Sequence, residues 1–267
     1  MRRPPHAPEL PDAARPRWPA WTAPVALLAA LLATVLAVIP FFPALILFLG
    51  SEPLAALGLL VLLVVQDSVF MATALLFALT RVQPKAWHFG VRPARLWPTL
   101  AWSVLGFAVM LGFELGYTEL LDVDETNVED LGEGNLLAAF FVSLAAIVVA
   151  PVSEEFFFRG FFYRALRTRL RPWSASLIDG LIFGGLHFES LDTAVILPII
   201  AAFGVGQCLV YERTGSLFAV IAIHAAFNSV AMAGVSVLPA LAVGALVLAS
   251  CLAVPARLRP APSPVPA

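Results

Sequence analysis

The chain has 267 residues, of which 60% are hydrophobic and 13% are charged. A mean hydropathy of +0.90 excludes an ordinary soluble domain. The formal net charge is only −2 at pH 7, and no nucleic-acid partner is expected. The sequence predicts an all-α polytopic membrane protein.

Residues 1–22 are rich in proline and arginine. Proline is poorly tolerated in a helix interior, and the segment lacks the apolar core of a signal peptide. It is therefore predicted to be a disordered cytoplasmic tail. Residues 255–267 have a similar composition and are predicted to be a second cytoplasmic tail, so that the transmembrane domain comprises residues 23–254.

About eight membrane spans are predicted between the two tails. They lie roughly at 23–49, 53–80, 96–117, 136–170, 173–188, 193–211, 216–232 and 235–254. Lys and Arg fall in alternate loops, whereas the opposite loops carry acidic residues, most of them in the outer loop 118–134. The positive-inside rule then predicts that both termini are cytoplasmic. The bias toward Ala, Arg, Pro and Leu is typical of a bacterial protein, which predicts the bacterial plasma membrane.

Several polar residues inside the spans are predicted to serve structure rather than catalysis. They are expected to line a water-filled cavity or to form hydrogen bonds between helices, and they are Asp67, Glu114, Asp179 and Gln207. Pro151 is expected to kink the fourth span and to free a backbone carbonyl. Cys208 and Cys251 have no spacing typical of a metal site or disulfide framework and are predicted to be small core residues.

The fourth span carries two adjacent glutamates, Glu154 and Glu155. A charge at this depth costs roughly 2.5–3.5 kcal/mol, so such residues are rarely without a role. Arg159 follows Glu155 at i+4, the spacing at which a carboxylate and a guanidinium meet on one helix face. Glu154 has no such partner, which favours it as a base that takes a proton from water. The alternative is a structural ion pair with a second glutamate in a polar cavity.

Two later spans carry further polar side chains. His187 lies near the outer end of the fifth span, and His224 and Asn228 share one face of the seventh because they are i and i+4. A single intramembrane histidine is more often a packing residue than a catalyst. If the three helices converge, however, the site holds a base, imidazoles and amide donors, which can activate water and bind an oxyanion.

Three segments together resemble the three motifs of the CPBP family: 150–160 with both glutamates and Arg159, 183–187 with Phe183 and His187, and 224–228 with His224 and Asn228. This family comprises the CAAX prenyl endopeptidases of the Ras-converting type and the bacterial proteins linked to bacteriocin immunity, also called Abi proteins. The resemblance covers about residues 136–232, which would form the protease core.

The resemblance implies an eight-helix intramembrane endopeptidase with a conical catalytic cavity. Glu154 and His187 would activate the hydrolytic water, and His224 and Asn228 would stabilise the oxyanion. The residues that would support the geometry of the site are Glu155, Arg159 and Phe183.

The family has also been described as metalloproteases, and the residues leave that alternative open. Glu154, His187 and His224 would then bind a catalytic zinc, with water in the fourth position. The chain has no His-Glu-x-x-His pair, and a glutamate–histidine mechanism needs no metal. A metal-free glutamic mechanism without a cofactor is therefore favoured.

The predicted partners are the lipid bilayer and a membrane-associated or lipid-anchored protein or peptide, of which one peptide bond is hydrolysed. A competing hypothesis is a non-proteolytic immunity or scaffold protein that binds a bacteriocin or another partner. A third is a proton-coupled transporter that uses the same side chains as a relay. The absence of a repeat in the sequence argues against the transporter.

Overall fold

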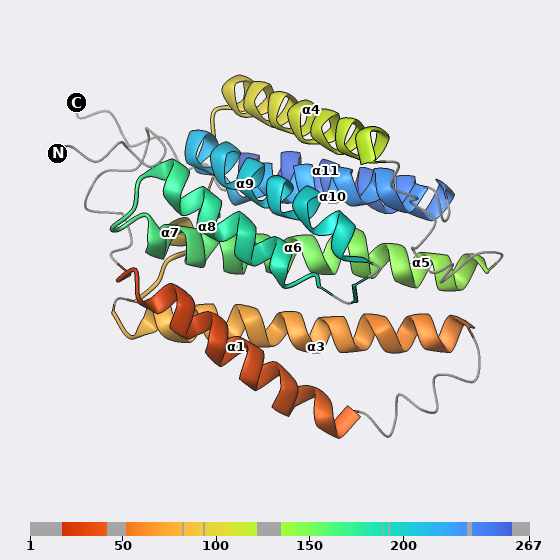
Figure 1. Cartoon of the computed structure of the whole chain (residues 1–267), viewed down its shortest axis with the longest axis horizontal. Helices are drawn as coiled ribbons and strands as arrows, with labels where there is room; N and C mark the ends of the chain where they lie inside the picture. Colours follow the sequence, from red (N-terminus) through yellow and green to blue (C-terminus); the bar gives the residue numbers. More distant parts are fainter. Residues whose placement is uncertain are drawn as a thin grey trace, which may run out of the picture.

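The computed structural model describes residues 18–41, 52–81, 83–92, 94–121, 135–188, 190–191, 193–233 and 237–257. These residues are 87% helical and include no strand. Their helices run roughly alongside one another in a bundle, with α1 and α3 on one side and α4 on the opposite side (Figure 1). The chain is an all-α polytopic membrane protein, as the sequence predicts.

The bundle contains both long and short helices. In chain order the α-helices are α1 Thr22–Val38, α3 Glu52–Leu79, α4 Leu96–Leu121, α5 Leu136–Leu144, α6 Ala150–Glu155, α7 Tyr163–Leu166, α8 Pro172–Gly185, α9 Leu197–Thr214, α10 Leu217–Ala233 and α11 Val237–Arg257. The short 3₁₀ segments are η2 Ile39–Phe41, η3 Ala86–Phe89 and η7 Thr193–Ile196. Two π-helical segments, η5 Ala145–Val149 and η6 Phe156–Phe162, join α5, α6 and α7 into one continuous helix.

Within the described ranges, six helical stretches are long and apolar enough to cross a membrane. The predicted spans 173–188 and 216–232 correspond to shorter helices, since α8 has 14 residues and α10 has 17. Helices therefore occupy each of the predicted positions. The count of eight crossings stays a prediction.

The N-terminal boundary differs from the predicted one. Trp18, placed in the disordered tail by its sequence context, is fully buried, and its ring centroid lies 5.0 Å from that of Phe89 and 5.1 Å from that of Phe161. Burying so large an apolar side chain stabilises a fold by roughly 1.5–3 kcal/mol, which explains why the packed structure begins before the first span. Residues 1–17 and 258–267 of the predicted tails and 122–134 of the acidic loop lie outside the described residues.

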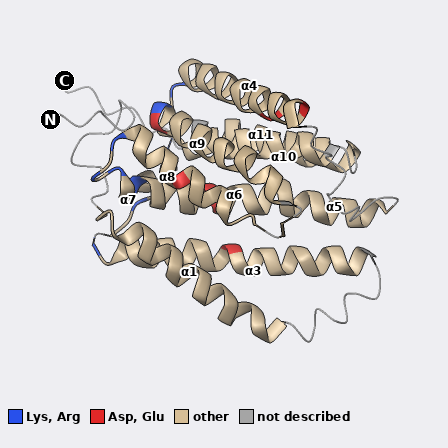
Figure 2. Cartoon of the chain, in the orientation of Figure 1, with Lys and Arg blue, Asp and Glu red and all other residues tan. Residues whose placement is uncertain are grey.

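Lys and Arg side chains of the described residues gather at one end of the bundle (Figure 2). Two of these arginines also have a structural role, because Arg164 and Arg167 are only 3% and 4% exposed. Arg167 binds both carboxylate oxygens of Glu212, at 2.7 and 3.0 Å, and Arg164 donates to the Tyr211 hydroxyl. These contacts fasten the end of the fourth predicted span to α9.

Helices α8 and α9 approach closely because glycine occupies both sides of their crossing. A Cβ atom on Gly180 would lie 2.6 Å from the Ala201 carbonyl oxygen, and one on Gly204 would lie 2.8 Å from the Gly180 Cα. Small residues permit such close approach between membrane helices. The contact also places the Gly204 carbonyl where a side chain of the fourth predicted span reaches it.

The two π-helical segments lie directly before and directly after the glutamate pair. The Ala150 N–H bonds to the Ala145 carbonyl, and the Tyr163 N–H bonds to the Phe158 carbonyl, in each case five residues earlier. Short π-helical segments within α-helices occur frequently at functional sites. The widened turns therefore mark α6 as the segment in which a site is expected.

Candidate active site

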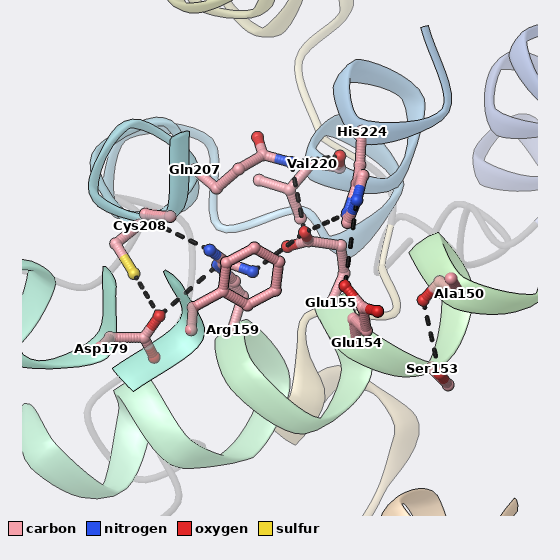
Figure 3. Close-up of polar contacts among 12 residues, drawn as sticks. Ala150, Ser153, Glu154, Glu155, Arg159, Asp179, Gln207, Cys208, Val220 and His224 are labelled. Atoms are coloured by element: carbon pink, nitrogen blue, oxygen red, sulfur yellow. Dashed lines mark hydrogen bonds and ion pairs between the residues drawn. The ribbon is translucent and has the colours of Figure 1, made fainter. Parts of the chain in front are cut away.

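Glu155 is the centre of a buried hydrogen-bond network (Figure 3). Its Oε1 atom accepts hydrogen bonds from Arg159 Nη1 at 3.0 Å, Gln207 Nε2 at 3.2 Å and His224 Nδ1 at 2.8 Å. The side chain is 0% exposed. Three donors from α9, α10 and its own helix thus hold this carboxylate in one orientation.

Arg159 completes the network from the other side. The predicted i+4 contact with Glu155 is confirmed, and Nη2 also donates to the Gly204 carbonyl at 3.0 Å. Its Nε lies 3.7 Å from Asp179 Oδ1, and its guanidinium carbon lies 4.6 Å from the centroid of the Phe183 ring. The guanidinium therefore contacts two carboxylates, a backbone carbonyl and the face of an aromatic ring, as expected for an arginine without access to water.

The helix–helix roles predicted for Asp179 and Gln207 are confirmed. Gln207 Nε2 donates to the Val220 carbonyl at 2.9 Å as well as to Glu155. The Cys208 thiol donates to Asp179 Oδ1 at 3.1 Å. Cys208 is buried, as predicted, but it is also a member of the network.

Glu154 has a different environment from its neighbour. Its side chain is 21% exposed, and its Oε2 atom is buried without a hydrogen-bond partner among the described residues. That atom lies 3.9 Å from His224 Nε2, which is beyond hydrogen-bond distance. The two carboxylates thus differ in exposure and in donors: Glu155 is 0% exposed and its Oε1 is held by three donors, whereas Glu154 is 21% exposed; the Oε2 atom of each has no hydrogen-bond partner among the described residues.

His224 lies between the two glutamates. Its Nδ1 is 2.8 Å from Glu155 Oε1, so Nδ1 carries a hydrogen and donates it to the carboxylate. Nε2 then faces Glu154. The ring packs against Phe203, with centroids 4.9 Å apart, which fixes its orientation.

His187 lies just beyond the end of α8, and Phe183 is close to both histidines. The Nδ1 atom of His187 is 2.8 Å from the Phe183 carbonyl oxygen, which makes Nδ1 the donor and leaves the lone pair on Nε2. The Phe183 ring lies 4.8 Å from the His187 ring and 6.1 Å from the His224 ring. The Phe183 ring thus lies near His187, Arg159 and His224, and its supporting role stays a prediction.

Asn228 is tied to the first π-helical segment. Its Nδ2 donates to the Ala146 carbonyl at 2.7 Å. In the i+5 pattern of this segment the partner of Ala146 would be the N–H of residue 151, which is proline and has none. The freed carbonyl expected near Pro151 is therefore that of Ala146, and Asn228 satisfies it while a second N–H of the same amide is still available.

The zinc alternative depends on whether its three possible ligands lie together. In the part of the chain that the structure describes, no three His, Cys, Asp or Glu side chains form a group that could hold a metal ion. Both histidines use Nδ1 in hydrogen bonds, an arrangement that metal-binding histidines also have, so the choice between a glutamic and a zinc mechanism stays a prediction.

A cavity of about 470 Å³ lies between α4, α10 and α11. It is bordered by the α10 residues Ala222 and Ala226, and none of the candidate catalytic side chains lines it. His224 is rotated by about 200 degrees from Ala222 on the same helix, so the cavity lies behind the candidate site. The conical catalytic cavity at Glu154 stays a prediction.

Comparison with known proteins supports the motif assignment. Residues 136–230 match the family of type II CAAX prenyl endopeptidase Rce1-like proteins, which confirms the resemblance over this segment. UPF0177 protein YbdI of Lactococcus lactis subsp. lactis (strain IL1403) is 32% identical over 115 residues, 37% of this chain and 61% of that protein. The chain thus spans about three fifths of the length of this curated relative. No solved structure matches the chain significantly.

Proposed function

We propose that this chain, whose residues 136–230 match the Rce1-like CAAX prenyl endopeptidases, is an intramembrane endopeptidase of the glutamic type. Its substrate is a membrane-associated or lipid-anchored protein or peptide, and its basic end faces the cytoplasm of a bacterial plasma membrane. The observation that carries the proposal is the contrast between the glutamates: Glu155 is fully buried and its Oε1 is held by three donors, whereas Glu154 is 21% exposed and its Oε2 lies beside His224 without a hydrogen-bond partner among the described residues.

In the proposed reaction, Glu154 takes a proton from a water molecule whose position is fixed with the help of His187 Nε2. The resulting hydroxide adds to the carbonyl carbon of the scissile peptide bond, and the carbonyl oxygen becomes an oxyanion. Glu154 then transfers the same proton to the departing amine nitrogen as the C–N bond breaks. One water is consumed, and Glu154 returns to the carboxylate form.

The oxyanion is stabilised by donors on α10. His224 donates Nδ1–H to Glu155, so it can donate to the oxyanion only in the form that carries a second hydrogen on Nε2; in the proposed reaction Nε2 carries this hydrogen from the start and keeps it. Asn228 contributes its remaining amide N–H, because the other is bound to the Ala146 carbonyl. Glu155 and Arg159 act by holding His224 and do not touch the substrate.

Asn228→Ala is expected to lower kcat by about 10²- to 10³-fold with little change in KM, since loss of one oxyanion donor has an effect of this size. Steady-state cleavage of a membrane peptide measures it. Asn228→Asp serves as the companion variant, because it keeps the volume but places a negative charge beside the oxyanion, and it should be at least as impaired. Wild-type kcat in Asn228→Ala would contradict the assignment.

The proposed function is tested with purified protein in lipid nanodiscs and a fluorogenic pool of membrane peptides. Wild type and Glu154→Gln are compared, each with and without a strong zinc chelator. Cleavage that requires Glu154 and survives chelation supports the glutamic mechanism. Loss of cleavage on chelation with recovery on added zinc would replace it by a metal mechanism, and cleavage by neither protein would favour a binding or immunity role.

A further inference from the structure

The cavity between α4, α10 and α11 is a candidate ligand site apart from the candidate active site. Its volume of about 470 Å³ lies within the range of about 300–1,000 Å³ that small-molecule sites usually have. On α4 its lining residues lie between Leu96 and Phe107, and on α11 they lie between Leu248 and Leu252. Both helices pack against α10, which supplies the third wall.

The walls of this cavity suit a hydrocarbon chain. All but four of the described residues that line it are Ala, Leu, Val, Ile or Phe, and the exceptions are Thr99, Ser103, Ser216 and Cys251. An extended peptide placed there would bury backbone N–H and C=O groups with few partners, which is costly in an apolar site. An acyl chain has no such groups and can fill the same space.

The cavity has about the length of one leaflet of a bilayer. Phe107 lies eleven residues beyond Leu96 on α4, which corresponds to about 16 Å at a rise of 1.5 Å per residue. The hydrocarbon core of a membrane is about 30 Å thick, so one leaflet contributes about 15 Å. The first turn of α4 lies at the basic end of the bundle (Figure 2). The cavity therefore extends from the basic end to about the middle of the membrane, as one acyl chain of a lipid does.

Positive charge and tryptophan flank the cavity toward the basic end. Arg95 is exposed and stands in the sequence between two lining residues. The guanidinium carbon of Arg213, which is also exposed, lies 4.9 Å from the centroid of the Trp102 ring, and Trp102 adjoins the lining residue Ser103. Tryptophan is enriched where membrane helices meet the lipid headgroups. Basic pockets between transmembrane helices on the cytoplasmic side are typical sites for anionic headgroups.

We propose that this cavity binds one acyl chain of an anionic glycerophospholipid from the leaflet at the basic end, with the lipid phosphate beside Arg95 and Arg213. The apolar walls and the length of the cavity account for the chain, and the two arginines account for the charge of the headgroup. The lipid is a ligand and not a substrate. The site is separate from the proposed active site, because none of the candidate catalytic side chains lines it.

The headgroup is tested by native mass spectrometry of the full chain in detergent. Phosphatidylglycerol and phosphatidylcholine with the same acyl chains are added in equal amounts, and wild type should retain one phosphatidylglycerol in preference to phosphatidylcholine. Arg213→Gln should lower this preference about fivefold, the usual contribution of one basic residue near an anionic lipid surface. Arg213→Lys keeps the charge and should retain most of the preference.

Arg81→Gln is the matched control for the headgroup. Arg81 is likewise exposed, and its guanidinium carbon lies 5.7 Å from the centroid of a tryptophan ring, that of Trp21, but it follows α3 on the side of the bundle opposite α4 (Figure 1). Its preference should stay within about twofold of wild type. Equal retention of the two lipids by wild type, or an equal loss of preference in Arg81→Gln and Arg213→Gln, would overturn the proposal.

The acyl chain is located by photo-crosslinking in nanodiscs, with phosphatidylglycerol that carries a diazirine in the middle of one chain. Adducts are expected on the lining residues of α4, α10 and α11. Ala222→Phe places a large side chain in the cavity and should remove most of them. Ala231→Phe is the same change on the same helix at an exposed position that does not line the cavity, and it should leave the adducts unchanged.

The adduct map of wild type also decides the proposal alone if Ala222→Phe does not fold, which thermal unfolding would reveal. Adducts spread evenly over the outer helices, adducts concentrated at the glutamates of α6, or unchanged adducts in a folded Ala222→Phe would overturn it. Neither experiment measures peptide cleavage. A protein that binds the lipid but cleaves no peptide would therefore refute the proposed function and leave the lipid site in place.

Discussion

Glu154→Gln is expected to reduce kcat by about 10²- to 10⁴-fold, the usual contribution of a general base, while the thermal stability of the protein stays close to that of wild type. The amide cannot accept a proton from water, but it keeps the size of the side chain. Glu154 Oε2 has no hydrogen-bond partner among the described residues, and its contact with His224 Nε2 is a long one of 3.9 Å, so the substitution removes no short contact of that atom. Single-turnover cleavage and thermal unfolding in the same detergent measure the two effects.

The adjacent glutamate provides the matched control. Glu155→Gln is expected to lower stability clearly, because it removes the charge that binds Arg159 and His224. Both variants carry the same chemical change, Glu to Gln, and they differ only in its position. Equal loss of stability in both, or equal loss of activity without loss of stability, would contradict the division of roles between them.

Arg159→Met is expected to destabilise the protein by about 3–5 kcal/mol, the typical result of removing one partner of a buried ion pair. Methionine fills part of the volume, but Glu155 is left with an uncompensated charge, and the Gly204 carbonyl loses its donor. Equilibrium unfolding in mixed micelles measures the change. Activity should fall in parallel, since His224 is held through Glu155.

A double-mutant cycle tests whether the charge is the cause. Glu155→Gln combined with Arg159→Met removes both members of the pair and should be more stable than the sum of the two single changes predicts. Arg159→Lys keeps the charge without the forked geometry and is expected to recover only part of the stability. Strict additivity in the cycle would show that the pair is not energetically coupled.

The sequence predicted those contacts that depend on the geometry of one helix. The Glu155–Arg159 pair follows from i+4 spacing, and a freed carbonyl near Pro151 follows from the missing N–H of proline. The sequence indicated that Gln207 bonds between helices, but it could not identify Glu155 as the partner of Gln207, nor the Gly204 carbonyl as a partner of Arg159. Both depend on how closely α8 and α9 cross and on the rotation of α9.

The ends of the fold were less predictable than its core. Trp18 follows a proline-rich and arginine-rich segment, and the neighbouring sequence does not indicate that the ring packs against Phe89 and Phe161. Arg164 and Arg167 belong to the basic end of the bundle, but the charge pattern did not indicate that both are buried and form hydrogen bonds to α9. In both cases the determining contacts come from distant parts of the chain.

The π-helical turns on either side of α6 change which residues share a face of this long helix, so a single helical-wheel plot does not describe it. Each π-helical segment accommodates one residue more than an α-helical turn, which rotates everything beyond it by about 100 degrees. The side chains of α5, α6 and α7 therefore cannot be placed on one helical wheel, although the three segments belong to one continuous helix. Deleting one residue within Ala145–Val149 should rotate both glutamates about the helix axis relative to α5. A helical-wheel plot drawn across the whole helix would assign the wrong face to the lipid.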